Sequence, residues 1–125
     1  MTEYELDLRV SLLLRDELEK RGYQVVMTRT DNDVDLSNAE RAQIAADADA
    51  DVFVRIHANG SQDPAVNGAL TTCMTKDNPY CGDLYPERRR LSDTVLTGLV
   101  EATGAAKKAS GKQIRYPGST GPRCL

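Results

Sequence analysis

The sequence contains one histidine, His57, and this residue has the widest choice of chemistry in the chain. A neutral imidazole can bind a metal ion, act as a general base or simply hydrogen-bond its neighbours. His57 ends the mostly apolar run 52–56 and is followed by the turn residues Asn59 and Gly60. A lone histidine at such a position is more often structural than catalytic, so any chemistry has to be argued from its partners.

Carboxylates are the most plentiful partners for a metal site built around His57. Catalytic zinc sites use about three protein ligands, drawn from histidine, cysteine and carboxylate side chains. Glu3, Glu5 and Asp7 stand together at the start of the first expected helix. Carboxylates there also stabilise the positive end of the helix dipole, which is their default interpretation. Residue types alone therefore leave both a metal site and a plain helix start open.

The cysteines do not show a metal-binding or redox pattern. Cys73, Cys81 and Cys124 lack the C-x-x-C spacing, and although Cys73 and Cys81 could pair as a disulfide, nothing in their spacing requires it. No G-x-S-x-G nucleophile motif and no phosphate-binding glycine loop occurs in the sequence.

Composition is that of one small domain. The chain has 125 residues and a formal net charge of −3, with acidic residues in excess early and basic residues late. The basic end is short and lacks interleaved aromatic residues, so we expect no nucleic-acid partner. We also expect no membrane span, and the acidic start has no signal-peptide core.

Hydrophobic periodicity predicts an α/β fold with a mixed, largely parallel central sheet flanked by helices. The expected helices cover 5–21, a stretch starting at Ser37 with a capping box, and 87–102. The expected strands cover 23–28, 51–57 and 69–75. In the first helix, an apolar stripe including Leu6, Val10 and Leu13 should face the core, while Asp7 should face solvent. We place one domain at 1–104 and an irregular tail at 105–125, which is rich in Gly, Lys, Ser and Pro.

Several segments in order resemble the zinc-dependent N-acetylmuramoyl-L-alanine amidases of the amidase-3 type. The segments are a glutamate opening a leucine-rich helix, a T-R pair, an S/L-x-x-R helix start, an I-H-A-N strand end and a later G-A-L. They stand at Glu3, Thr28-Arg29, 36–41, Ile56-His57-Ala58-Asn59 and 68–70. The resemblance covers roughly residues 2–104.

The resemblance implies a peptidoglycan hydrolase that cleaves the amide between N-acetylmuramic acid and L-alanine with a Zn²⁺-activated water. Matching places Glu3 on the glutamate ligand of the zinc and His57 on a histidine ligand, with Glu5 as the rival of Glu3. Asn59, next to the ligand position, is the candidate for substrate binding. The implied partner is the glycan-peptide of peptidoglycan, and the implied location is the cell envelope or the outside of the cell.

The chain also departs from the family pattern. The H-G-G strand that carries another zinc-binding histidine is absent, and so is the catalytic glutamate in an E-x-G-F-like setting. We therefore expect weak or no zinc binding by this chain alone and an incomplete catalytic site. The alternatives are a non-catalytic remnant or peptidoglycan-binding module, and an unrelated small α/β protein.

Overall fold

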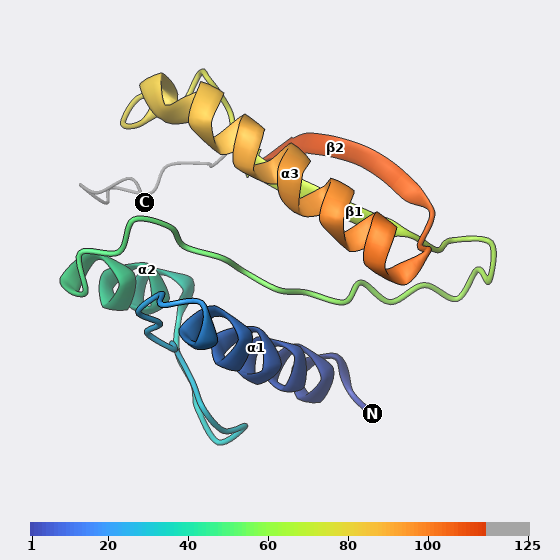
Figure 1. The fold of residues 1–125 in the computed structure, drawn as a ribbon, viewed down its shortest axis with the longest axis horizontal. Helices are drawn as coiled ribbons and strands as arrows, with labels where there is room; N and C mark the ends of the chain where they lie inside the picture. The colour runs from blue at the N-terminus through green and yellow to red at the C-terminus, as the bar shows by residue number, and fades with distance from the viewer. Residues whose placement is uncertain (115–125) are drawn as a thin grey trace. The chain divides into compact units, whose positions relative to one another are not determined.

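The structure, a computed structural model, describes residues 1–114, with the backbone alone for residues 109–114. The chain forms two compact units, Met1–Gly60 and a second unit that begins at Ser61. Its elements in order are α1 (Glu3–Lys20), α2 (Asn38–Asp47), β1 (Ala69–Met74), the short 3₁₀ helix η1 (Gly82–Leu84), α3 (Tyr85–Thr103) and β2 (Lys107–Ile114) (Figure 1). The predicted α/β class is confirmed, with a sheet of two parallel strands in the described residues.

Helix α1 begins and ends where its local chemistry predicts. The Glu5 carboxylate accepts hydrogen bonds from the Thr2 backbone N–H at 2.7 Å and from its hydroxyl at 2.9 Å, which fixes the first turn. Gly22, just beyond the last turn, has a φ of 88°, which glycine adopts without steric cost. The predicted span of 5–21 is thus confirmed to within two residues at each end.

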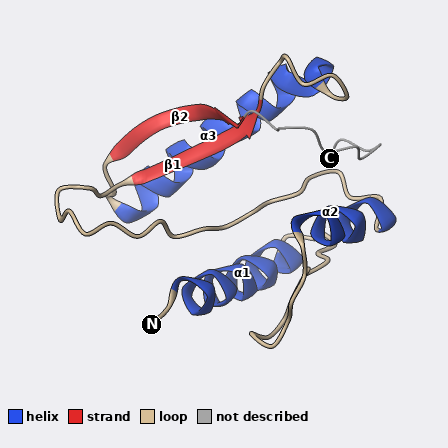
Figure 2. Cartoon of the chain, turned by 180° about the vertical axis from the view of Figure 1, so that it is seen from behind, coloured by secondary structure: helices blue, strands red, loops and turns tan. Residues whose placement is uncertain are grey.

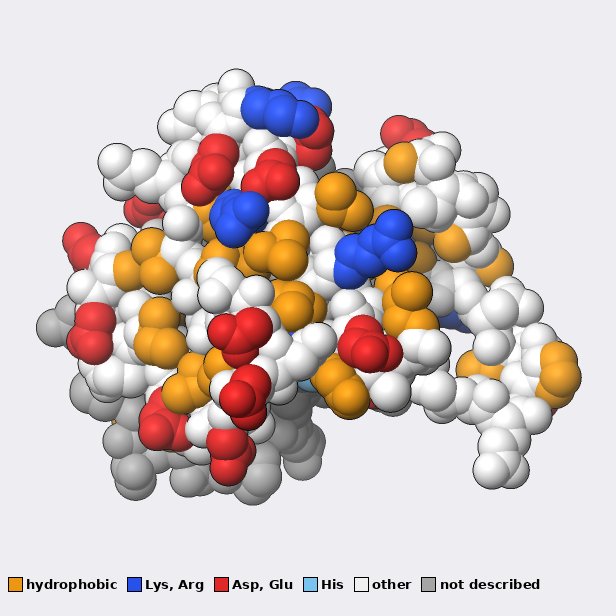
Figure 3. All heavy atoms as spheres, turned by 90° about the horizontal axis from the view of Figure 1, so that it is seen from below, with side chains coloured by type: hydrophobic (Ala, Val, Ile, Leu, Met, Phe, Trp, Pro, Cys, Tyr) orange, Lys and Arg blue, Asp and Glu red, His pale blue; other side chains and the backbone are white. Residues whose placement is uncertain are grey.

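The predicted orientation of α1 is wrong in part. Leu6, Val10 and Leu13, expected to face a core, are exposed, whereas Asp7, expected to face solvent, is buried. Figure 3 shows apolar side chains open to solvent between acidic ones on the face in view. The prediction assumed a large sheet beneath the helix, and the described part of this unit contains no strand to provide one.

Helix α2 confirms the predicted capping box. The Ser37 hydroxyl accepts a hydrogen bond from the Glu40 backbone N–H at 3.2 Å. In return, the Glu40 carboxylate accepts from the Ser37 N–H at 2.8 Å and from its hydroxyl at 2.7 Å. Two otherwise unpaired donors at the helix start are satisfied in this way.

The two strands predicted at 23–28 and 51–57 are wrong. Both segments are connecting chain without a strand assignment, although each contains three β-branched residues. A segment forms a β-strand only when its N–H and C=O groups hydrogen-bond to a neighbouring strand. β-propensity mainly reflects how well a side chain packs on a sheet that already exists. Among the described residues, neither segment has a strand beside it to pair with.

The second unit is a strand–helix–strand unit. β1 and β2 pair in parallel, and α3 connects them and packs against both strands (Figure 2). Parallel neighbours need such a crossover connection. The third predicted strand and the third helix are confirmed, but Lys107–Ile114 forms β2, where irregular chain was expected. The rest of the predicted tail, 115–125, lies outside the described residues.

The core of the second unit centres on α3. Leu96 is completely buried, with 0% of its surface exposed, and it is the largest fully buried side chain in the described chain. The Thr71 hydroxyl of β1 donates a hydrogen bond to the Ser92 carbonyl of α3 at 2.9 Å. Cys73 carries a free thiol, so the possible disulfide between Cys73 and Cys81 is not formed.

Candidate metal centre

Three metal-binding side chains converge within the first unit, and their donor atoms lie within 4.8 Å of one another. His57 Nδ1 lies 3.4 Å from Glu3 Oε1 and 3.8 Å from Asp7 Oδ2. Glu3 and His57, both singled out from the sequence, are thus brought together across 54 positions of chain. Asp7 was not predicted to join them.

Helix geometry explains why the side chains of Glu3 and Asp7 lie side by side. Residues four positions apart lie on the same face of an α-helix, one turn above the other. α1 begins at Glu3, so both carboxylates belong to its first turns. The i, i+4 spacing from Glu3 is the sequence signal that could have identified Asp7 as a third member.

Arg29 ties the connecting chain to the same end of α1. Its Nη2 donates a hydrogen bond to the Tyr4 carbonyl at 2.7 Å, and its Nη1 donates to Asn32 Oδ1 at 2.7 Å. Arg41 of α2 similarly donates from Nε to the Leu36 carbonyl at 3.2 Å. The Arg29 contact connects the loop before α2 to the first turn of α1, and the Arg41 contact connects the same loop to α2.

Arg55 orients the imidazole of His57. The two side chains lie two residues apart on one side of an extended segment, and Arg55 Nη2 approaches His57 Nε2 to 3.4 Å. The same Nη2 donates to Asn38 Oδ1 at 3.0 Å, which connects the segment to the start of α2. Nε2 therefore faces Arg55, and Nδ1 is the ring nitrogen that faces the two carboxylates.

Burial differs sharply within the cluster. The side chains of Glu3 and His57 are about half exposed, at 49% and 55%. The Asp7 side chain is only 12% exposed, and its Oδ1 is buried without a hydrogen-bond partner in the described residues. A buried, unsatisfied carboxylate oxygen is costly and calls for a cation or a donor. One imidazole and two carboxylates form a donor set that zinc accepts, so these residues fit that ion.

A family comparison bears on this cluster directly. The amidase-3 family model, described as N-acetylmuramoyl-L-alanine amidase, matches residues 1–116. The chain belongs to this amidase family. No curated protein and no solved structure matches the chain. The predicted family is thereby confirmed, and the matched residues include all three members of the cluster.

Within this amidase family member, the structure separates the two rival glutamates. Glu3 faces His57, whereas the Glu5 carboxylate binds the backbone and hydroxyl of Thr2. Those hydrogen bonds, the backbone one first, lower the pKa of Glu5 from its usual value. Glu5 therefore serves the helix cap and is not a member of the cluster. Asn59 is exposed and outside the cluster, and its role in substrate binding stays a prediction.

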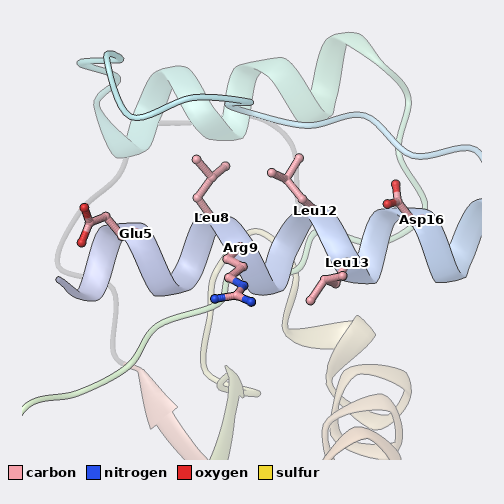
Figure 4. A pocket seen from close by; sticks show the side chains of 6 residues that line it. All are labelled: Glu5, Leu8, Arg9, Leu12, Leu13 and Asp16. Carbon is pink, nitrogen blue, oxygen red and sulfur yellow. The ribbon is translucent and has the colours of Figure 1, made fainter. Parts of the chain in front are cut away.

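A shallow hollow of about 310 Å³ on α1 is separate from the cluster of Glu3, Asp7 and His57. Figure 4 shows Leu8 and Leu12 pointing to one side of the helix and Leu13 to the other. The polar residues that line the hollow are Glu5, Arg9 and Asp16, and none of the three residues of the cluster lines it. This hollow therefore contributes none of the candidate metal ligands. Among residues 1–114, no helix is long and apolar enough to cross a membrane.

Proposed function

We propose that Glu3 and His57 belong to the zinc centre of a peptidoglycan hydrolase. Its reaction is hydrolysis of the amide between N-acetylmuramic acid and L-alanine of the stem peptide. The observation that carries the proposal is the 3.4 Å approach of His57 to Glu3, in a chain that belongs to the N-acetylmuramoyl-L-alanine amidase family. The substrate would then be the cell wall, and the place of action the cell envelope or outside the cell.

The chain's own residues have distinct tasks in this proposal. Glu3 and His57 would hold the ion, and their side chains are about half exposed, which suits a bulky polymeric substrate. When bound, zinc polarises an amide carbonyl and lowers the pKa of a water ligand. The tie from Arg55 to Asn38 holds the extended segment that carries His57. In this proposal Asn59, which is exposed two residues beyond His57, contacts the glycan or the stem peptide.

The sequence led us to expect weak or no zinc binding, but the three-donor cluster changes this: we now expect this chain alone to bind zinc without turning over substrate. It has a single histidine, and no glutamate follows Glu101 to take the role of the family's catalytic glutamate. The same observation favours a second candidate function, a module that binds peptidoglycan without cleaving it. Clearing of a wall suspension distinguishes an active hydrolase from such a module.

The test combines metal titration with a cell-wall assay. Zinc calorimetry on the purified chain should show binding that His57→Ala and Glu3→Gln each weaken by about a hundred-fold or more, since loss of an outer partner alone typically costs 10–100-fold. Glu19→Gln, an exposed glutamate of the same helix, is the matched control and should bind as the parent does. Unchanged affinity in both ligand variants would refute the assignment.

The wall assay uses sedimentation and turbidity together. The chain should co-sediment with purified peptidoglycan and leave the turbidity of the suspension unchanged. Clearing of the suspension that His57→Ala abolishes would show that the chain holds a complete active site. Absence of co-sedimentation would argue against any role at the cell wall.

A further inference from the structure

We propose that Asp7 is a third protein ligand of the metal held by Glu3 and His57. This inference rests on the proposed zinc centre and adds a residue to it. Glu3 and His57 supply two of the about three protein ligands that a catalytic zinc site uses. The fold places the carboxylate of Asp7 next to this pair.

Position is the first argument. Asp7 Oδ2 lies 3.8 Å from His57 Nδ1, and its donor atoms fall within the 4.8 Å span of the cluster. It stands one helical turn from Glu3, on the same face of α1. The two carboxylates therefore approach the imidazole from adjacent turns of one rigid element, which is the most precise support a site can have.

Burial is the second, independent argument. Asp7 has 8% of its surface exposed, and its Oδ1 has no hydrogen-bond partner among the residues that the structure describes. Buried carboxylates are normally paired with a cation or with several donors. A divalent ion between the three side chains would supply that positive charge.

The other possible role for Asp7 is structural, and the structure offers little for it. The hydrogen bond from the Ser11 hydroxyl, at 2.6 Å, goes to the Asp7 backbone carbonyl and not to the carboxylate. Replacing the carboxylate by the isosteric amide would leave that bond in place. A ligand role and a structural role therefore predict opposite effects on the metal-free protein.

The experiment compares Asp7→Asn with the parent chain by zinc calorimetry and by the absorption spectrum of the Co²⁺-loaded protein. We expect zinc affinity to fall by roughly tenfold or more and the cobalt spectrum to change, because a ligand atom is lost. Without metal, the melting temperature of Asp7→Asn should equal or exceed that of the parent, since a buried charge is removed. Asp16→Asn, on an exposed position of α1, is the matched control.

The outcomes separate this inference from the proposed function. Zinc binding lost in His57→Ala and Glu3→Gln but kept in Asp7→Asn, with an unchanged cobalt spectrum, overturns the role of Asp7 alone. Zinc binding kept in all three variants overturns the metal centre itself. A metal-free Asp7→Asn chain that melts well below the parent would show a structural role. Asp7→Glu, which retains a carboxylate, should then recover part of the lost affinity only if Asp7 is a ligand.

Discussion

Each of the two units of this chain is stabilised internally, and the kind of contact differs between them. The unit of residues 1–60 contains the cluster, and polar contacts from arginines and caps connect its parts: Arg29 to Tyr4, Arg55 to Asn38, Ser37 to Glu40. The unit that begins at Ser61 has a parallel strand pair covered by α3 and the fully buried Leu96. Its described residues contain no comparable group of metal-binding side chains.

This difference suggests that the second unit contributes most of the apolar packing, while the first unit positions the possible metal ligands. Apolar packing is non-directional and contributes most of the stability of a domain, whereas hydrogen bonds and ion pairs set side-chain geometry and contribute less. The first unit buries only a few apolar side chains, Leu8, Ala45 and Ala46 among them. We therefore expect changes in the second unit to affect stability, and changes around the cluster to affect metal affinity.

The largest expected effect is on stability and comes from Leu96→Ala. Removing a fully buried leucine side chain leaves a cavity and typically costs about 2–5 kcal/mol. Urea unfolding followed by circular dichroism measures the loss. Leu99→Ala, three residues along α3 and 42% exposed, is the control and should cost much less. Loss of zinc affinity in the folded Leu96→Ala chain, equal to that of His57→Ala, would contradict the division between units.

The next effect is on metal affinity and comes from Arg55→Gln. The Arg55 guanidinium lies 3.4 Å from His57 Nε2, so its positive charge opposes a divalent cation nearby. We expect zinc affinity to rise roughly three- to tenfold at low salt and by less at high salt, because salt screens the charge. Calorimetry at two ionic strengths measures both values.

Arg15→Gln provides the matched control for Arg55→Gln. Arg15 pairs with its neighbour Asp16 at 2.8 Å and does not contact the cluster. Its loss should leave zinc affinity unchanged. A fall in affinity in Arg55→Gln would mean that the tie to Asn38 matters more than the charge.

A smaller effect is expected from the α2 cap. Ser37→Ala removes the hydroxyl that accepts from the Glu40 N–H, and loss of such a cap costs about 1 kcal/mol. Urea unfolding should detect it, while Ser37→Thr keeps a hydroxyl and should retain most of the stability. Equal losses in the two variants would show that the hydroxyl is not the cause.

The smallest effect is a shift in one titration. The hydroxyl of Ser37 and then its backbone N–H lower the pKa of Glu40 in the folded chain. A carboxyl whose folded pKa lies below its unfolded value stabilises the fold above the unfolded pKa, and this contribution is lost as the pH falls through the folded pKa. In Ser37→Ala the pKa of Glu40 should move upward, towards its usual value, in a carbon-detected NMR titration.

Glu17 is the internal control in the same NMR experiment. Its pKa is lowered by the hydrogen bond and then the charge of Lys20, which lies on α1, and it should not move in Ser37→Ala. A shift of both residues would indicate a general change of the unit and not the loss of one cap.

Local sequence signals predicted the elements that are stabilised locally. The α2 capping box at Ser37 and Glu40, the glycine that ends α1, and the span of α3 follow from contacts within a few residues. The strands predicted at 23–28 and 51–57 failed, and the segment 107–114 turned out to be a strand. Strand formation depends on a partner distant in the sequence, and β-branched content does not show where that partner lies. The domain boundary after residue 104 remains a prediction.

By itself the sequence determined the α/β class, the amidase family, and Glu3 and His57 as candidate metal ligands. Helix periods, caps and ordered motifs are local or linear properties, so they can be read along one chain. Only the tertiary structure decided that Glu3 and not Glu5 faces His57, and that Asp7 is buried beside them. Those facts depend on which face of α1 contacts the segment around His57, some 50 residues further along the chain. No local sequence pattern specifies that contact.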